Sequence, residues 1–454
     1  MKSSTGRLSS GRSLRRDTPR SSHAQFDRSK SLDPVELVLS QEKDRIESLV
    51  PVRRERMAES AFAFYRAGAR LMAMDLASTP RTGILVQASG DAHVSNFGWY
   101  GSPEREIVFD TNDFDETLKA AWEWDVKRLA TSFVIAGRDN GFGARQQRKA
   151  ARFAVDAYQE AMRGSASSPV LDVWYAQMSA DDALERLEAE ARTHDLHKAQ
   201  KAFRKASRRD SRHVLGKLAE HVDGRYRIAD DPPFVVPLRS MSFPLDPDRV
   251  RELVAEVFGG YLDSVSPSIR TLISRFDIVD VALKVVGVGS VGTKCFIAML
   301  EGNGAEDVLF LQLKEAGRSV LEDEFGESDL DHAGRRVVEG QRLIQTTSDI
   351  MLGWTTSSSG TQYYVRQLKD MKASANLAKF DPDDMATYAR VCGAVLANAH
   401  ARSGDPALIA GYLGSNNAFA KATTEFATAY ADQNERDYGA FLDYVRGGDS
   451  PAGS

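Results

Sequence analysis

The feature that most constrains the fold is a change of pattern at residue 278. From there, IVDVALKVVGVGSVGTKCFIAMLEGNGAEDVLFLQLKEA (278–316) consists of short β-branched and apolar runs separated by glycine-rich turns. These runs predict three strands joined by tight turns, and hence a small antiparallel sheet. The preceding WEWDVKRLATSFVIAGRDNG (122–141) instead repeats apolar residues at helical spacing. A chain of 454 residues with both patterns is predicted to be an α+β protein with a helical lobe and a small antiparallel β lobe.

The chain start and the bulk composition exclude several classes of protein. Residues 1–32 are rich in Ser, Arg and Lys, which predicts a disordered basic leader. No apolar run reaches the ~18–20 residues of a membrane span and the start lacks a signal-peptide core, so a cytoplasmic protein is expected. The two cysteines, Cys295 and Cys392, lie far apart in apolar runs, which predicts neither disulfides nor a cysteine metal site. A formal net charge of −5 gives no reason to expect a nucleic-acid partner.

Acidic and amide side chains are crowded into GDAHVSNFGWY (90–100) and VFDTNDFDE (108–116). The flanking runs GILVQA (83–88) and EIVFD (106–110) predict two short strands that pair with each other. A carboxylate in such a loop can accept a hydroxyl proton, and an amide oxygen with a second carboxylate can hold Mg²⁺. This set is typical of phosphoryl-transfer sites, and a loop of turn-forming residues is the alternative. The candidates are Asp91, Asn96, Asp110, Asp113 and Asp115.

A second motif, GVGSVG (287–292), contains Gly287, Gly289 and Gly292. In a dinucleotide-binding fold a helix follows the third glycine, whereas here the β-branched and aromatic run TKCFIAML follows. This disfavours nicotinamide binding and favours a strand-turn-strand hairpin whose backbone N–H groups, with Ser290, lie over phosphates. An ordinary flexible hairpin is the alternative.

The third candidate is a lysine on the last predicted strand, VLFLQLKEA (308–316). Alternation places Lys314 on the face of Phe310 and Gln312, opposite three leucines. Such a lysine needs a partner or water, because an unpaired buried charge is unfavourable. Glu339, in the helical segment that follows, is the predicted partner in a pair that holds nucleotide phosphates. An edge-strand lysine that reaches solvent is the alternative.

Together, these motifs resemble a protein-kinase-like site. GDAHVSNFG, FDTNDFDE and WEWDVKRLA are similar to the aminoglycoside and choline phosphotransferase pattern, in which a Gly-Asp-x-His-x-x-Asn loop precedes an Asp-Phe-Asp-type metal motif and an Asp-Leu-Ala helix. The resemblance implies a catalytic base at Asp91 and metal ligands at Asn96 and Asp113. It also implies that Asp125 anchors the backbone of the catalytic loop.

Two further positions keep alternatives open, and the order of the motifs departs from the pattern. Asp110 directly follows a predicted strand and competes with Asp113 for the metal, while His93 is expected to support the loop rather than act as a base.

The glycine turn and the lysine follow the catalytic loop by about 200 residues, whereas in kinases they precede it. YARVCGAVLANAHARSG (388–404) resembles the helix that normally leads into the catalytic loop. The resemblance therefore implies a two-lobed, protein-kinase-like fold in circularly permuted order.

From about residue 45 the chain also resembles the bacterial family called domain of unknown function 2252. The segments RMAESAFAFYRAG, GDAHVSNFG, FDTNDFDE, WEWDVKRLA and AHARSGD…IAGYLG carry this resemblance, which implies no particular activity. The stretch RRERM…FAFYR adds Arg53, Arg54 and Arg66 as phosphate or substrate contacts, with surface or packing roles as the alternative.

The predicted function is ATP- and Mg²⁺-dependent transfer of a phosphoryl group to a small hydroxyl compound. The alternatives are a metal-dependent phosphohydrolase that uses Asp91, His93, Asp110 and Asp113, and a nucleotide-binding regulatory protein that catalyses no reaction.

The basic run HKAQKAFRKASRRDSRH (197–213) is typical of a solvated helix face, with a phosphate-rich partner as the alternative. The predicted division is a disordered leader (1–32), a catalytic helical lobe (33–277, with the catalytic loop at 90–98 and the metal motif at 110–116), a β-rich nucleotide-binding lobe (278–370), a helical return (371–445) and a flexible tail (446–454).

Overall fold

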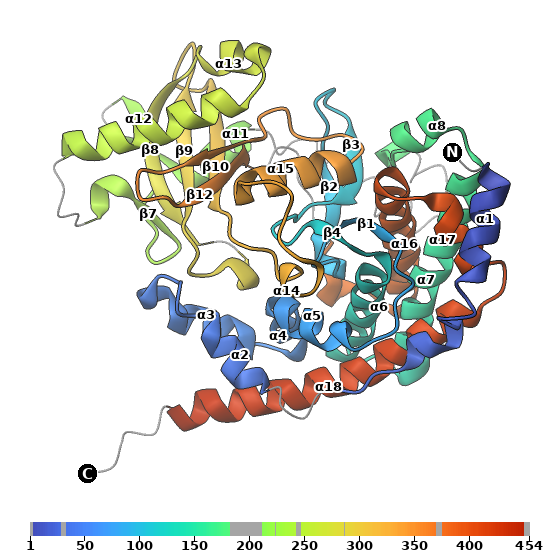
Figure 1. Cartoon of the computed structure of the whole chain (residues 1–454). Coiled ribbons are helices and arrows are strands. Elements are labelled where there is room, and N and C mark those ends of the chain that lie inside the picture. The colour runs from blue at the N-terminus through green and yellow to red at the C-terminus, as the bar shows by residue number, and fades with distance from the viewer. Residues whose placement is uncertain are drawn as a thin grey trace.

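The computed structural model describes residues 3–28, 33–181, 211–222, 224–241, 247–285, 287–368 and 375–448. The basic run at 197–213 lies outside these ranges up to residue 210, as do residues 371–374 of the helical return and 449–454 of the tail. Within them, a helical body and an antiparallel sheet lie side by side (Figure 1), which confirms the predicted α+β class. None of the helices in the described part is both long and apolar enough to cross a membrane.

Six strands form one antiparallel sheet in the order β11-β12-β10-β9-β8-β7. The three strands predicted from residue 278 onwards are confirmed as β8, β9 and β10, each paired with the next. β7 precedes residue 278, so the sheet also takes a strand from the segment that the sequence assigns to the helical lobe. The strands are β7 (Val235–Pro237), β8 (Asp277–Lys284), β9 (Cys295–Glu301), β10 (Val308–Glu315), β11 (Gly353–Thr356) and β12 (Gln362–Gln367).

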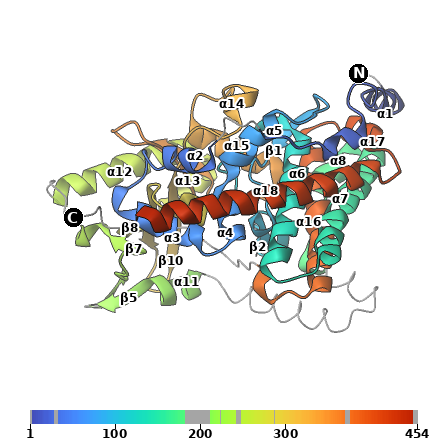
Figure 2. The same cartoon turned by 90° about the horizontal axis from the view of Figure 1, so that it is seen from below.

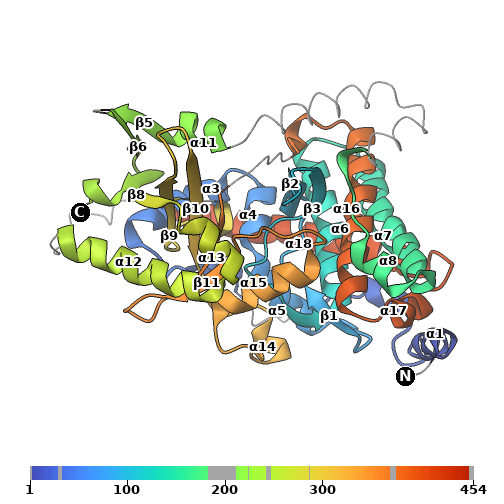
Figure 3. The same cartoon turned by 90° about the horizontal axis from the view of Figure 1, so that it is seen from above.

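Alternating side chains of this sheet enter two separate apolar cores, one on each face. Phe310 packs with residues of α11 and the β5–β6 hairpin, whereas Leu309 and Leu311 pack with residues of α12 and α13. Figure 3 shows the sheet between these two layers. Gln312 and Lys314 continue the Phe310 face and line a cavity. The covering elements are α11 (Ser211–Leu218), β5 (Ala219–Val222), β6 (Arg225–Ile228), α12 (Pro247–Ser264) and α13 (Pro267–Ile273).

The helical body is built around α6, which is buried along most of its length. Trp122 of α6 stacks on Tyr158 of α7, with ring centroids 5.7 Å apart. Asp381 starts α16 by accepting hydrogen bonds from the next backbone N–H groups, as DPDD predicts. The long helix α18 runs beneath the body towards α2, α3 and α4 (Figure 2). The helices outside the sheet layers are α2 (Pro34–Ser40), α3 (Val50–Ala58), α4 (Ala61–Ala67), α5 (Ala69–Ala77), α6 (Trp122–Asp139), α7 (Ala144–Ser167), α8 (Val170–Tyr175), α14 (Glu322–Phe325), α15 (Ala333–Ile344), α16 (Pro382–Ser403), α17 (Pro406–Leu413) and α18 (Ala418–Gly448).

The prediction of a disordered leader is wrong for the described residues 3–28. Helix α1 (Ser4–Ser13) packs along α17, and a side chain at Gly11 would overlap the carbonyl oxygen of Leu408. Arg15 donates to the carbonyl oxygen of Tyr412 at 2.8 Å, and Arg20 donates to that of Leu413 at 2.6 Å. The arginines that suggested a solvated leader therefore cap the C-terminal carbonyls of α17, and a glycine permits the close helix contact.

The predicted pairing of the strands near residues 83–88 and 106–110 is also wrong. β1 (Leu85–Ala88) pairs with β4 (Leu118–Ala121), and β2 (Phe97–Gly101) pairs with β3 (Ile107–Thr111). A short connection joins β2 to β3, so this hairpin closes locally, while β1 is left to pair with the strand that leads into α6. As a result, Asp91 and Asn96 lie in the connection from β1 to β2, and residues 112–116 lie in the connection from β3 to β4, whereas Asp110 lies on β3 itself.

Candidate functional site

A cavity of about 1070 Å³ lies between the helical body and the sheet. It is lined by residues of the β1–β2 loop, the acidic β3–β4 connection, the glycine-rich turn and the strand β10. The described lining residues include nine Lys or Arg and six Asp or Glu, so the cavity is more basic than the chain as a whole. Segments about 200 residues apart in sequence therefore share one charged space.

The backbone of the β1–β2 loop is held by a buried carboxylate at the start of α6. Asp125 accepts hydrogen bonds from the N–H groups of Ser89 at 2.6 Å and Gly90 at 3.0 Å. Its Oδ2 also lies 3.2 Å from Nε2 of His400, whose Nδ1 is 2.9 Å from the hydroxyl of Tyr158. These are the contacts expected of a loop anchor, and they fix the position of the next residue, Asp91.

Asp91 faces the cavity with one carboxylate oxygen engaged. Its Oδ1 accepts a hydrogen bond from Nε of Arg128 at 2.6 Å and forms an ion pair with Nη2 of the same guanidinium at 2.5 Å. Its Oδ2 lies 3.7 Å from Nε2 of His93. Burial raises the pKa of Asp91 to about 6 even though Arg128 opposes this shift. At neutral pH, Asp91 is therefore an ionised carboxylate of raised basicity, which suits a proton acceptor.

His93 lines the same cavity but is poorly suited to be the base. Burial and the nearby guanidinium of Arg128 lower the pKa of His93, so its imidazole is neutral. Its backbone N–H donates to the carbonyl oxygen of Asp91 at 2.8 Å, which closes the turn of the loop. Its Nδ1 is buried and has no hydrogen-bond partner among the described residues. These contacts agree with the supporting role expected for His93.

The two candidates for a second metal ligand occupy different environments. Asp113 is about one-third exposed and lines the cavity together with Asn96, whose Nδ2 donates to the carbonyl oxygen of Asp91 at 2.9 Å. Asp110 is buried and accepts from the N–H groups of Thr111 at 2.7 Å and Thr346 at 3.2 Å. Among the described lining residues Asp113 is present and Asp110 is not, so the geometry favours Asp113.

No group of three His, Cys, Asp or Glu side chains in the described ranges is placed to hold a metal. Mg²⁺ is usually bound through one or two carboxylates together with waters and substrate phosphates. A single carboxylate at Asp113 and the amide of Asn96 match that mode better than a cage made only of protein ligands.

Lys314 is buried on β10 and its partner is not the predicted one. Its Nζ contacts Asp115 and lies 4.0 Å from Oδ1 of Asp113. Asp115 also accepts from the hydroxyl of Tyr364 at 2.7 Å. The two carboxylates hold the pKa of Lys314 well above its usual value, and Lys314 lowers that of Asp115.

The prediction that Glu339 pairs with Lys314 is wrong. Glu339 is bonded to Arg342 at 3.1 Å on the outer side of α15 and is 41% exposed. Gln341 and Gln345, four residues apart, lie on the side of α15 that lines the cavity. Glu339 is two residues from Gln341 and therefore points to a different side of the helix. Asp115 belongs to the acidic motif already singled out in the sequence, but nothing in the sequence assigned it to the lysine.

The glycine motif forms the predicted strand-turn-strand connection between β8 and β9, with a short 3₁₀ turn at Val288–Ser290. Gly287, Gly289 and Ser290 line the cavity. Gly292 has a φ of +88°, a left-handed conformation that favours glycine, and its carbonyl accepts from the N–H of Ile46 at 2.8 Å. Ile46 lies in the segment that leads into α3, and this segment therefore holds the turn in place.

The arginines predicted as site contacts divide into two groups. Arg53 and Arg54 both contact Glu42, and neither is among the described lining residues. Arg66 lines the cavity. Arg366 was not singled out in the sequence; it lies opposite Gln312 across β10 and β12 and donates to its Oε1 at 3.0 Å. Only strand pairing brings Arg366 here, so no local pattern could have revealed it.

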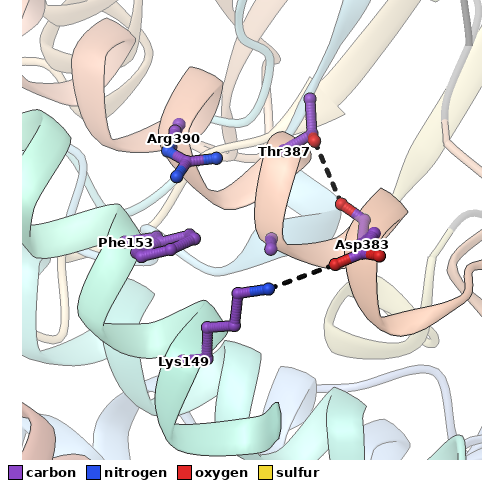
Figure 4. A pocket seen from close by; sticks show the side chains of 6 residues that line it. Lys149, Phe153, Asp383, Thr387 and Arg390 are labelled. Carbon is purple, nitrogen blue, oxygen red and sulfur yellow. Dashed lines mark hydrogen bonds and ion pairs between the residues drawn. The ribbon is translucent and has the colours of Figure 1, made fainter. Parts of the chain in front are cut away.

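A second, smaller hollow of about 230 Å³ lies between α7 and α16 (Figure 4). Its charged groups are engaged with their neighbours: Lys149 pairs with Asp383 at 3.1 Å, and the guanidinium of Arg390 lies 3.8 Å from the ring centroid of Phe153. None of the residues predicted from the sequence to be functional lines this hollow, so the charged cavity is the stronger candidate.

Fold and site together define a mixed α+β protein in which a helical body and an antiparallel sheet enclose one charged cavity bordered by a glycine-rich turn. The model of the family described as "Uncharacterized protein conserved in bacteria (DUF2252)" matches residues 45–444. The chain belongs to this family, as the sequence resemblance indicated. Neither the curated proteins nor the solved structures contain a match to this chain.

Proposed function

We propose that this protein is an ATP- and Mg²⁺-dependent phosphotransferase that acts on a small hydroxyl compound, with a protein-kinase-like site in circularly permuted order. One observation carries the proposal: the acidic loop with Asp91 and Asp113 and the distant segment with Gly289 and Lys314 line the same cavity. A phosphoryl-transfer site requires these two sets of groups to meet, because one handles the acceptor and metal and the other the phosphates.

Asp91 is assigned to the acceptor hydroxyl. In the proposed step, the acceptor oxygen forms a bond to the γ-phosphorus while the bond between this phosphorus and the β–γ bridging oxygen breaks, and ADP leaves. The hydroxyl proton passes to Oδ2 of Asp91, since Oδ1 is held by Arg128. The contact with Arg128 also fixes the direction of the carboxylate, and such positioning is a large part of catalysis in these reactions.

Lys314 and the glycine-rich turn are assigned to the phosphates. The raised pKa of Lys314 keeps its ammonium charged, and the excess of basic residues in the lining suits a polyanionic ligand. Asp113 and Asn96 would hold Mg²⁺ against these phosphates, and the ion would neutralise charge that develops during transfer. Lys314 contacts Asp115 and lies 4.0 Å from Oδ1 of Asp113, which supports a role for its ammonium beside the proposed metal.

The test is the variant Asp91→Asn, assayed with ATP, MgCl₂ and a panel of small alcohols, sugars and amino alcohols. We expect nucleotide binding to persist while turnover is lost, because only the proton acceptor is removed. Asp156→Asn is the control, since Asp156 pairs with Arg152 on the surface of α7. Full turnover by the Asp91→Asn enzyme would contradict the assignment. Hydrolysis of phosphoesters without ATP, unaffected by Lys314→Ala, would instead identify a phosphohydrolase.

A further inference from the structure

Arg66 lines the cavity and has no ion-pair partner among the residues that the structure describes. It lies in the last turn of α4 and is partly buried; burial lowers its pKa, while the charges of Asp91, Asp113 and Glu59 raise it. It forms no ion pair with a described residue, and its Nε has no hydrogen-bond partner among these residues. These three carboxylates influence Arg66 electrostatically, but none of them forms an ion pair with it among the described contacts.

The position of Arg66 is fixed by the elements around it. The carbonyl of the preceding residue, Tyr65, accepts from Nη2 of Arg128 at 3.2 Å, and the same Arg128 holds Asp91. On the other side, a side chain placed at Gly289 would lie 3.7 Å from the carbonyl oxygen of Arg66. The end of α4 therefore lies between the loop of the proposed base and the glycine-rich turn.

A partly desolvated guanidinium without an ion-pair partner gains stability when an anion binds it. The planar fork of arginine matches the oxygens of phosphate and carboxylate groups, and its contacts to charged oxygens are the strongest hydrogen bonds in proteins. At this position the anion would lie between the phosphate-binding turn and Asp91. In a phosphoryl-transfer site, that is where the transferred group passes.

We propose that Arg66 binds the terminal phosphoryl group of the nucleotide and stabilises its charge during transfer, so that the chain supplies this arginine itself. This inference rests on the proposed function. It predicts that Arg66 distinguishes a nucleoside triphosphate from a diphosphate, since ADP lacks the group that it binds. An anionic group on the acceptor is the competing ligand, and that ligand would give no such distinction.

The test is calorimetric titration of the full chain with MgADP and with a Mg²⁺-bound ATP analogue whose β–γ bridge resists cleavage. In Arg66→Met, we expect the dissociation constant of the analogue to rise about 10- to 100-fold, the loss typical of a hydrogen bond to a charged group, with that of ADP unchanged. Arg70→Met is the matched control, because Arg70 lies in the first turn of the next helix, α5, pairs with Asp323 and is outside the described cavity lining.

Each other outcome has a defined meaning. If wild-type protein binds both nucleotides and Arg66→Met binds the analogue equally well, or loses both ligands equally, the role of Arg66 is overturned and the nucleotide site stands. If wild-type protein binds neither nucleotide, the proposed function fails and this inference fails with it. Should Arg66→Met not fold, Arg66→Lys carries the same test, because it keeps the charge but loses the fork, and a several-fold weaker affinity for the analogue alone is expected.

Discussion

Lys127 provides a quantitative test of the packing that supports the site. It lies on α6, directly before the site residue Arg128. It is fully buried, and its side chain points into the apolar core. The ammonium lies 4.6 Å from the ring centroid of Phe426 and has no hydrogen-bond partner among the described residues. Burial therefore lowers the pKa of Lys127 to about 7.

The pH dependence follows from the difference in pKa between the two states. In the unfolded chain the lysine keeps its proton up to about pH 10.5, whereas in the folded protein it is already half neutral at pH 7. Between these values the unfolded state binds more protons, so the free energy of unfolding rises with pH. From pH 7 to pH 9 the contribution of Lys127 to this rise is about 2 kcal/mol, at about 1.4 kcal/mol per proton and pH unit.

The perturbation is Lys127→Met, which keeps an unbranched chain of similar length and removes the titrating group. We expect this variant to be more stable than the wild type at pH 7 and to lack the added stability at pH 9. Urea unfolding followed by tryptophan fluorescence at both pH values measures the two free energies. Lys149→Met is the control, because Lys149 is 44% exposed and paired with Asp383. Equal changes between pH 7 and pH 9 in wild type and Lys127→Met would refute the reasoning.

Three further predictions concern the site and the leader. Lys314→Met is expected to weaken nucleotide binding about tenfold or more, measured by calorimetry, because a charge-assisted contact is lost, whereas Glu339→Gln leaves it unchanged; an equal effect of both would restore the sequence-based pairing. The rate constant kcat/KM is expected to rise with pH around a midpoint near 6, because Asp91 must be ionised to accept a proton and burial raises its pKa to about 6; a pH-independent rate would argue against this base. Arg15→Ala and Arg20→Ala are each expected to lower the free energy of unfolding by about 1 kcal/mol, since each arginine donates to the end of α17; unchanged urea midpoints would mean that the leader does not stabilise the fold.

Local signals in the sequence predicted several elements correctly. Alternating residues and glycine-rich turns specified β8, β9 and β10, because both are set by neighbours a few positions apart. Asp381 likewise marked the start of α16 through contacts with the next few backbone groups. The same alternation placed Gln312 and Lys314 on one strand face, where the structure has them lining the cavity.

Predictions that depended on distant partners failed more often. The pairing of β1 with β4 depends on which strand is free once β2 and β3 have closed their hairpin, and nothing within β1 encodes that choice. The basic composition of the leader is compatible with solvation, yet its arginines cap a helix that lies about 390 residues later in the chain. In such cases the structure depends on which surfaces pack together, and the composition of a segment does not determine this.

The sequence alone determined which side chains are available for chemistry: the carboxylates and amide of the acidic loop, the glycine-rich turn and one lysine on a strand. Only the tertiary structure decided how they combine: it brings Asp91 and Gly289 to one cavity, gives Lys314 the partner Asp115 and leaves Arg66 without an ion pair to any described residue. The physical reason is the distance along the chain over which each kind of interaction acts. Helix starts and strand alternation arise from contacts a few residues apart, whereas the partner of a charged side chain depends on how separately formed elements pack together.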